Sequence, residues 1–533
     1  MTGRTWKRFL TVSLTGWLVF TAPLTLGEDG YDLWLRYPPL EPAPPASSVS
    51  AIVEPADSSE TLQAALGELR RGLGGLLGAE PATVSEPAAN AIVLATPKHR
   101  PGLAEMKLPL EELGEDGYLV RHARLNDVPV TLVAGNTDRG LLYGAFALLR
   151  HLQTGGRLET IDLSSAPRVR LRLLNHWDNL DRYVERGYAG QSLWDWWRLP
   201  DVVDPRYTDY ARANASIGIN GTVLNNVNAA AEALTPRYIE KAAALADVFR
   251  PWGIRVYLSA RFSAPVDVGG LETADPLDPA VRNWWRDKAA EIYARIPDFG
   301  GFLVKANSEG QPGPQNYGRS HADGANMLAA ALAPHGGAVM WRAFVYSDTD
   351  PEDRVRQAYS EFKPLDGEFA DNVLVQVKNG PLDFQPREPF HPLFGAMQQT
   401  PLLMEFQITQ EYLGFSTHLV YLGSLWEEVL QSDTFAAGPG STVARVVDGS
   451  LHDKRLSGIA GVANTGTDRN WSGSIFGQAN WYAFGRLAWN PNASAAAIAE
   501  EWLRMTFSDD PRFVGPARDI MLRSREAAVD YMT

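Results

Sequence analysis

Two stretches between residues 372 and 412 place charged side chains directly after apolar runs. The run Val373–Val377 is followed by Lys378 and Asp383, and the run Leu402–Ile408 is followed by Glu411. A buried parallel strand reads as a near-continuous apolar run. In a barrel of parallel strands, the residues just beyond the carboxyl ends of the strands build the active site. The two stretches therefore predict two carboxylates and one lysine on a shared rim.

Runs of the same kind recur from about residue 166 onward, each followed by polar residues and then by a helical segment. The eight runs are Val169–Leu174, Gly221–Leu224, Arg255–Leu258, Gly301–Val304, Val339–Val345, Val373–Val377, Leu402–Ile408 and Gly458–Ala463. Eight strands that alternate with helices over roughly 300 residues predict a (β/α)₈ barrel. A doubly wound sheet also alternates, but no Gly-rich phosphate loop follows the first strand.

The 533 residues suggest two or three domains. Residues 28–165 contain short strands and helices in alternation, which indicates an N-terminal α/β domain. Residues 166–484 form the predicted catalytic barrel. Residues 485–533 read as the start of a C-terminal helical domain, with helices at Ser494–Phe507 and Arg512–Tyr531.

Residues 1–27 have the pattern of a secretory signal. Basic residues at Arg4, Lys7 and Arg8 precede the apolar stretch Phe9–Ala22. That stretch is short for a membrane-spanning helix, so we favour a cleaved signal over a membrane anchor. The pattern predicts export to the periplasm or the extracellular space. The chain has no cysteine, which excludes disulfides and thiolate chemistry.

Composition narrows the class of partner. The net charge is −14 and no cluster of lysine or arginine is present, which argues against a nucleic-acid ligand. Sixteen tryptophans are consistent either with core packing or with stacking on sugar rings. No segment has metal-ligand spacing such as H-E-x-x-H, so we predict no metal, and we predict no other cofactor. No G-x-S-x-G nucleophile elbow occurs in a strand–turn–helix context.

The predicted barrel brings acids, cations and rings to one rim. They are Asp178, Glu309, Asp383, Glu411, His176, Lys305, Arg342, Lys378, Trp177 and Trp341. Carboxylates can donate a proton and activate water, and Arg and Lys can hold an anionic group of a substrate. The alternative is that these charges only pair with one another, with Glu309 a solvated loop residue and Glu411 the first-turn acid of a helix. Burial of Lys305 after Gly-Phe-Leu-Val would be costly without a purpose.

Five segments carry a resemblance to a known family. They are LLNHWDN (173–179), VKANSEGQPGP (304–314), MWRAFVY (340–346), VQVKNGPLDFQPREPFHPLFGAM (375–397) and MEFQITQEYLG (404–414). They resemble glycoside hydrolase family 67, the α-glucuronidases that act on xylan fragments. The resemblance extends from the N-terminal domain through the barrel.

The resemblance implies a role for each matching residue. Glu309 matches the general acid, and Asp383 with Glu411 matches the pair that activates water, with the base role undivided between them. Lys305, Arg342 and Lys378 match the cations that hold the uronate carboxylate, and Trp177 and Val227 match positions near the 4-O-methyl group. The implied reaction is hydrolysis, with inversion, of the α-1,2 bond between (4-O-methyl-)glucuronic acid and the terminal xylose of glucuronoxylan-derived oligosaccharides. Because cations favour the ionised form of a neighbouring acid, we expect Glu309 to lie away from them, against apolar surface.

The chain departs from the family at its C-terminus. Family members continue as a longer helical domain that contributes to the site rim and to a homodimer, so we expect a fragment or a truncated member. Two alternatives stay open: a non-catalytic uronate-binding relic of the enzyme, and a retaining glycosidase that uses Glu405 or Glu411 as nucleophile.

Overall fold

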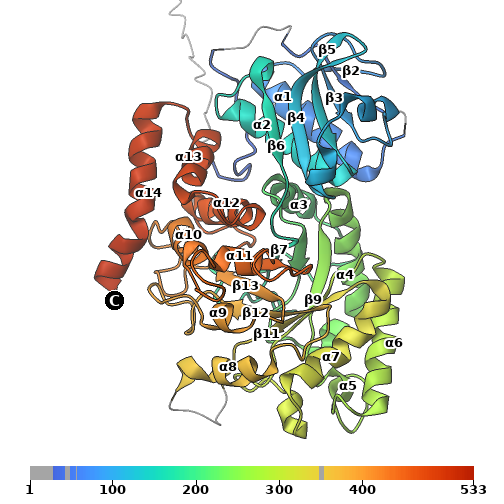
Figure 1. Cartoon of the computed structure of the whole chain (residues 1–533), viewed down its shortest axis with the longest axis vertical. Helices are drawn as coiled ribbons and strands as arrows, with labels where there is room; N and C mark the ends of the chain where they lie inside the picture. The colour runs from blue at the N-terminus through green and yellow to red at the C-terminus, as the bar shows by residue number, and fades with distance from the viewer. Residues whose placement is uncertain (1–27, 43–47, 56, 347–352, 533) are drawn as a thin grey trace, which may run out of the picture.

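The computed structural model describes residues 28–42, 48–55, 57–346 and 353–532. The segment 1–27, which the sequence predicts to be an export signal, lies outside these ranges. Two sheets organise the described part: a six-stranded sheet in the N-terminal third and a closed eight-stranded barrel that follows it (Figure 1).

The N-terminal sheet has the strand order β2-β1-β3-β5-β4-β6. Its strands are β1 (Ala51–Val53), β2 (Ala82–Val84), β3 (Ala91–Ala95), β4 (Tyr118–Leu125), β5 (Val128–Gly135) and β6 (Asp162–Ser165). Strand β4 runs antiparallel to both of its neighbours, and the other pairs are parallel. Helices α1 (Glu60–Leu77) and α2 (Asp138–Gln153) pack together and bury leucine-rich faces.

The barrel closes in the order β10-β11-β12-β13-β14-β7-β8-β9, and every pair in it is parallel. Its strands are β7 (Leu171–Asn175), β8 (Gly221–Val223), β9 (Arg255–Ser259), β10 (Gly301–Val304), β11 (Ala338–Arg342), β12 (Val373–Lys378), β13 (Leu402–Gln407) and β14 (Gly458–Val462). The predicted (β/α)₈ architecture is therefore confirmed. The prediction for β11 ran too far, because the chain leaves the strand after Arg342 and carries Phe344 to the rim.

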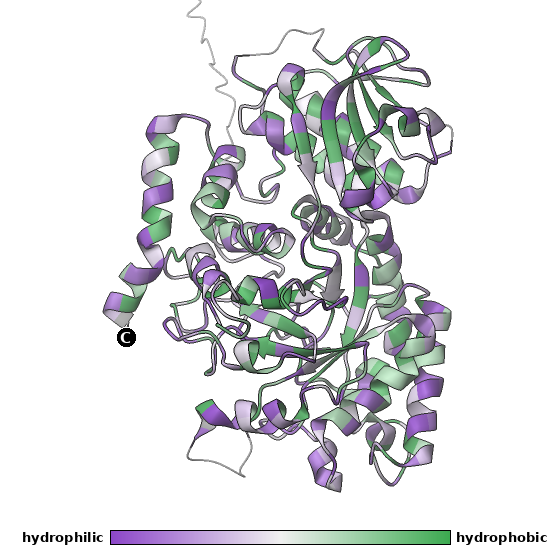
Figure 2. Ribbon diagram, viewed as in Figure 1, coloured by the Kyte–Doolittle hydropathy of each residue, from purple (hydrophilic) through white to green (hydrophobic). Residues whose placement is uncertain are grey.

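Alternating strand residues fill the barrel and cover its outside, as expected for buried parallel strands. The inward set forms a core of its own that includes Leu173, Val223, Leu303, Met340, Leu374 and Leu403. The outward set packs under the helices, and Figure 2 shows the apolar colouring concentrated on the strands and the inner helix faces. Most tryptophans belong to this packing, since nine of them are less than 2% exposed.

The helices between and after the barrel strands vary in length. They are α3 (Arg206–Ser216), α4 (Pro236–Phe249), α5 (Ala264–Asp267), α6 (Pro279–Arg295), α7 (His321–Leu332), α8 (Arg354–Phe362), α9 (Leu393–Ala396), α10 (Gly423–Gln431), α11 (Val443–Val447), α12 (Ile475–Trp489), α13 (Ala495–Thr506) and α14 (Pro511–Met532). The predicted domain boundary at residue 484 falls inside α12. Within the described ranges, no helix combines the length and the apolar character needed to cross a membrane.

A buried ion pair joins the N-terminal unit to the barrel. Arg212 of α3 donates from Nε and Nη2 to the two carboxylate oxygens of Glu68 in α1, at 2.6 and 2.7 Å. The hydroxyl of Tyr37 donates to the same carboxylate at 2.6 Å. The Glu68 side chain is 1% exposed and that of Arg212 is 8% exposed. Since an unpaired buried charge is strongly unfavourable, this contact fixes the two units against each other.

Candidate active site

The carboxyl ends of β10, β11, β12 and β13 are neighbours in the barrel and supply most of the charged side chains. Lys305 follows β10, Arg342 ends β11, Lys378 ends β12, and Glu405 lies within β13. All four side chains are buried. Each cation is paired with a carboxylate from the same rim, as described next.

Lys305 is held by an amide and an acid. Its Nζ donates to Oδ1 of Asn228 at 2.8 Å and forms an ion pair with Glu309. Asn228 follows β8 and in turn donates to Glu185 at 3.0 Å. Burial, reinforced by the charge of Arg342, lowers the pKa of the Lys305 ammonium.

Glu309 occupies a constrained loop directly after β10. Its φ of 50° lies in the left-handed region, which side chains other than glycine rarely adopt. Two hydrogen bonds to the backbone of Tyr346 hold the loop. The Glu309 N–H donates to the Tyr346 carbonyl at 3.1 Å, and the Tyr346 N–H donates to Oγ of Ser308 at 3.1 Å.

The expected surroundings of Glu309 are not found. The side chain is 46% exposed and is paired with Lys305, whereas the sequence predicts apolar surroundings away from the cations. That prediction is wrong because Lys305 and Glu309 are four residues apart in one tight loop, which brings the buried ammonium within reach of the carboxylate.

Arg342 and Glu405 form a buried bidentate pair. The guanidinium donates from Nε at 2.8 Å and from Nη2 at 2.6 Å to the two carboxylate oxygens, and Gln376 donates to Glu405 at 2.7 Å. Burial works against the charge of Glu405, but Arg342 outweighs it and holds the pKa of Glu405 below its usual range. No acceptor for Nη1 of Arg342 is found among the residues that the structure describes. One edge of the guanidinium therefore remains available to a ligand.

Lys378 and Asp383 form the third pair. The Lys378 ammonium contacts one oxygen of Asp383, and the hydroxyl of Tyr412 donates to the other at 3.1 Å. Lys378 Nζ also lies 3.1 Å from the ring centre of Phe344. Burial, together with the charge of Arg342, lowers the pKa of Lys378 to about 8. Burial alone would raise the pKa of Asp383, but the charge and hydrogen bond of Lys378 hold it below its usual range.

Glu411 lies beyond β13 in different surroundings. One oxygen forms an ion pair with Arg186, whose Nε lies 2.7 Å away, and the other accepts a hydrogen bond from Gln407 at 2.8 Å. The carboxylate is 7% exposed, whereas the Arg186 side chain is half exposed. Burial and the negative charge of Asp383 raise the pKa of Glu411, against the opposing effects of Gln407 and Arg186. Glu411 is therefore a stronger base than Asp383.

Trp177 and Val227 belong to the upper part of the barrel core, in the same apolar cluster as Phe384. Both are buried, at 6% and 4% exposure. The Trp177 ring centre lies 5.5 Å from the guanidinium carbon of Arg342. The two side chains thus belong to an apolar wall that reaches Arg342.

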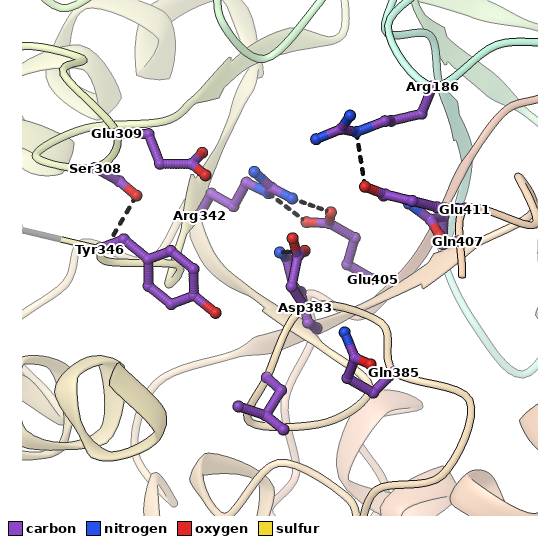
Figure 3. Close-up of polar contacts among 12 residues, drawn as sticks. Arg186, Ser308, Glu309, Arg342, Tyr346, Asp383, Gln385, Glu405, Gln407 and Glu411 are labelled. Atoms are coloured by element: carbon purple, nitrogen blue, oxygen red, sulfur yellow. Dashed lines mark hydrogen bonds and ion pairs between the residues drawn. The ribbon is translucent and has the colours of Figure 1, made fainter. Parts of the chain in front are cut away.

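The arrangement is shown in Figure 3. Glu309 and Glu411 lie on opposite sides of the Arg342–Glu405 pair, and Asp383 lies between them. Strand order agrees, because two strands separate β10 from β13. A ligand bound over Arg342 would have one carboxylate on each side, which is the arrangement needed to donate a proton and to activate water.

Two residues of the predicted rim have structural roles instead. His176 contacts the hydroxyl of Tyr210 at 2.7 Å, and Asp178 accepts a hydrogen bond from Ser192 at 2.5 Å. Both side chains are buried, at 1% exposure or less.

The sequence did not assign roles to Arg186, Asn228 and Tyr412, and it offered Glu405 only as an alternative nucleophile, not as the partner of Arg342. A signal existed only for Glu405, since a charge within the apolar run Leu402–Ile408 is costly without a buried partner.

Comparison with solved structures is informative about the fold alone. A GH138 enzyme targeting pectin rhamnogalacturonan II superposes with a TM-score of 0.54 at 15% identity, covering 90% of this chain and 55% of that protein. A GH115 4-O-methyl-alpha-glucuronidase with specificity for decorated arabinogalactans gives 0.54 at 12% identity, covering 90% and 62%.

Relatives found by sequence comparison are more similar to this chain than those two structures are. Alpha-glucuronidase A of Emericella nidulans is 40% identical over 541 residues, which is 97% of this chain and 63% of the relative. The chain thus spans under two thirds of that relative's length. Residues 33–148, 151–471 and 472–533 match the N-terminus, the middle domain and the C-terminus of glycosyl hydrolase family 67. From its N-terminal sheet to its last helices, the chain belongs to glycosyl hydrolase family 67.

Proposed function

We propose that this protein is an inverting α-glucuronidase. Its substrates would be short glucuronoxylan-derived oligosaccharides, and the bond cleaved would be the α-1,2 link between (4-O-methyl-)glucuronic acid and the terminal xylose. The observation that carries the proposal is the cluster of three buried cations with a carboxylate on either side. The printed name of the Emericella relative, alpha-glucuronidase A, supports the same activity.

Recognition in this proposal depends on exchange of ion-pair partners. The uronate carboxylate binds the ammonium groups of Lys305 and Lys378 and the available edge of the Arg342 guanidinium. Without substrate, each of these three cations forms an ion pair with a carboxylate of the rim. A sugar without a carboxylate cannot replace those acids, so neutral sugars are excluded. Trp177 and Val227 form the apolar wall against which a 4-O-methyl group would pack.

The exchange of ion-pair partners at Lys305 also prepares Glu309 to act as the general acid. When the uronate takes over Lys305, the Glu309 carboxyl loses its contact with that ammonium and is free to face the glycosidic oxygen. The protonated carboxyl then donates to the glycosidic oxygen as the bond between that oxygen and the anomeric carbon breaks, and the oxygen leaves as a hydroxyl of xylose. On the opposite side, Glu411 accepts a proton from the water that attacks the anomeric carbon, with Asp383 orienting that water. One displacement of this kind inverts the configuration.

Glu405 is poorly suited to act as the nucleophile of a retaining mechanism. Both of its oxygens bind Arg342, and one also binds Gln376. Attack on an anomeric carbon would require it to abandon a buried ion pair, which is strongly unfavourable.

Proton NMR of the reaction with 4-O-methylglucuronosyl xylotriose tests the proposal. We expect β-glucuronate as the first-formed anomer, followed by slow mutarotation. The α-anomer appearing first would rule out a single displacement. Calorimetric binding of the oligosaccharide without any release of xylotriose would instead indicate a binding protein.

The pH dependence of activity should report the surroundings of Glu411. Its carboxylate must be ionised to accept a proton, so activity is lost as the pH falls through its raised pKa. Arg186 opposes that rise, and removing its charge in Arg186→Gln raises the pKa further. We expect the acidic limb of kcat/KM to move to higher pH in this variant. Arg469→Gln, a distant surface change, should leave the limb in place, and an unmoved limb in Arg186→Gln would exclude Glu411 as the base.

The affinity for glucuronate should fall as the pH rises through about 8. The cause is loss of the Lys378 proton, whose pKa burial lowers to about 8. Calorimetry with glucuronate between pH 6 and 9 measures this. In Lys378→Met we expect affinity at pH 6 to be about 10–100-fold weaker, as for loss of a charged hydrogen bond. The affinity of the variant for glucuronate should no longer fall between pH 6 and 9. If it still falls, a group other than Lys378 is responsible for the pH dependence.

A further inference from the structure

A second cavity lies at the amino end of the barrel, opposite the rim described above. Its volume is about 440 Å³. It is lined by residues at the starts of four neighbouring strands: Leu171 and Arg255 begin β7 and β9, and Asn220 and Ser457 directly precede β8 and β14. The loop Leu113–Asp116 of the N-terminal unit lines it as well. The cavity therefore lies where the two units meet.

The lining of this amino-end cavity is strongly cationic. Seven cations and three acids line it: Arg139, Arg168, Arg170, Arg172, Arg255, Lys454 and Arg455, with Glu115, Asp116 and Asp448. The whole chain, by contrast, has a net charge of −14. The cavity therefore carries a local excess of positive charge in a protein that is acidic overall.

The three acids are already engaged. Asp116 pairs with Arg139 at 2.7 Å and with Arg172 at 2.8 Å. Glu115 pairs with Arg139 at 3.0 Å, and Asp448 lies 3.8 Å from Arg168. Three further guanidiniums, those of Arg170, Arg255 and Arg455, are exposed and have no ion-pair partner among the described residues.

Tyr257 contributes a hydroxyl to the same cavity. The residue is 2% exposed and lines the cavity, yet its hydroxyl has no hydrogen-bond partner within the described part of the chain. Gly300 and Gly221 make room for its ring, since a Cβ at these positions would lie 2.1 and 2.7 Å from ring atoms. Burial raises the pKa of Tyr257 while Arg255 and Arg170 lower it, which indicates that the hydroxyl lies near these two guanidiniums.

We propose that the amino-end cavity binds a multiply charged oxyanion of the phosphate class. Arg170, Arg255 and Arg455 would hold it through the paired N–H groups of their guanidiniums, which match the geometry of phosphate oxygens, and the Tyr257 hydroxyl would donate to it. The volume exceeds what inorganic phosphate fills, so a phosphate attached to a sugar-sized group also fits. This ligand is distinct from the proposed substrate, whose single carboxylate binds at the other end of the barrel.

Calorimetry on the intact chain tests the site, with inorganic phosphate and glucose 1-phosphate titrated at constant ionic strength. We expect saturable binding of both by the wild type. The double variant Arg170→Gln/Arg255→Gln should bind at least about tenfold more weakly, as for loss of charged hydrogen bonds. Tyr257→Phe keeps the ring that the glycines accommodate and should weaken binding several-fold without altering the fold.

Two controls locate the binding. Arg295→Gln removes a guanidinium that pairs with Glu240 on the helical shell and should bind phosphate like the wild type. Lys378→Met alters only the opposite rim and should retain phosphate binding. The proposal is overturned if the wild type shows no saturable binding, if the double variant is unchanged, or if binding is lost only in Lys378→Met. Stronger binding of glucuronate than of phosphate at this end would exclude the phosphate class.

Discussion

Replacing Glu309 by glutamine should lower kcat on 4-O-methylglucuronosyl xylotriose by about 10²–10⁴-fold, the usual contribution of a positioned general acid. The amide is nearly isosteric and keeps a polar contact with Lys305, but it has no acidic proton to transfer to the departing xylose. With a 4-nitrophenyl α-glucuronide the leaving group is 4-nitrophenolate, which needs little protonation as it departs. On that substrate the variant should approach the wild-type rate.

The difference between the two substrates is what identifies an acid. An equal loss on both would mean that Glu309 acts only by positioning Lys305. Glu240→Gln, on the outer face of α4, is the matched control and should leave both rates unchanged.

Replacing Glu405 by alanine should destabilise the barrel by about 3–5 kcal/mol, because it leaves the guanidinium of Arg342 buried without its partner. Both side chains are at most 2% exposed, so water cannot compensate. The measurement is the midpoint of thermal unfolding, followed by circular dichroism. A midpoint within a degree of the wild type would show that Arg342 finds another partner.

The double variant Arg342→Met/Glu405→Leu separates stability from function. Replacing both members of a buried ion pair by apolar residues is often neutral for stability. We therefore expect the midpoint to recover most of the loss seen in Glu405→Ala. Binding of glucuronate should not recover, because the guanidinium that would hold the uronate is absent.

Patterns that depend on burial were predictable from the sequence. The eight apolar runs, of which Val373–Val377 is typical, correspond to the eight barrel strands, because a strand covered on both faces tolerates few polar residues. The short strands β2 and β6 were not predicted. They lie at the edges of the N-terminal sheet, where partial exposure removes the apolar signal.

The rim was predictable as a set of residues but not as a set of contacts. Parallel strands bring their carboxyl ends together, so Lys305, Arg342 and Lys378 were expected to meet. Which acid pairs with which cation depends on loop geometry, and the left-handed turn at Glu309 has no sequence signal comparable to a glycine. For the same reason the contact between Arg186 and Glu411 could not be predicted, since the two residues lie in loops far apart in the chain.

The bond between Glu68 and Arg212 has a consequence for how the protein can be divided. The carboxylate is in the first unit and the guanidinium in the second, and each is buried only while the other is present. A chain cut between β6 and β7 would yield two pieces that each expose an isolated charge set in an apolar surface. Each piece alone should be less stable than it is in the intact protein, and the two pieces should associate when mixed. This junction is therefore a suitable place to split the protein into complementing halves.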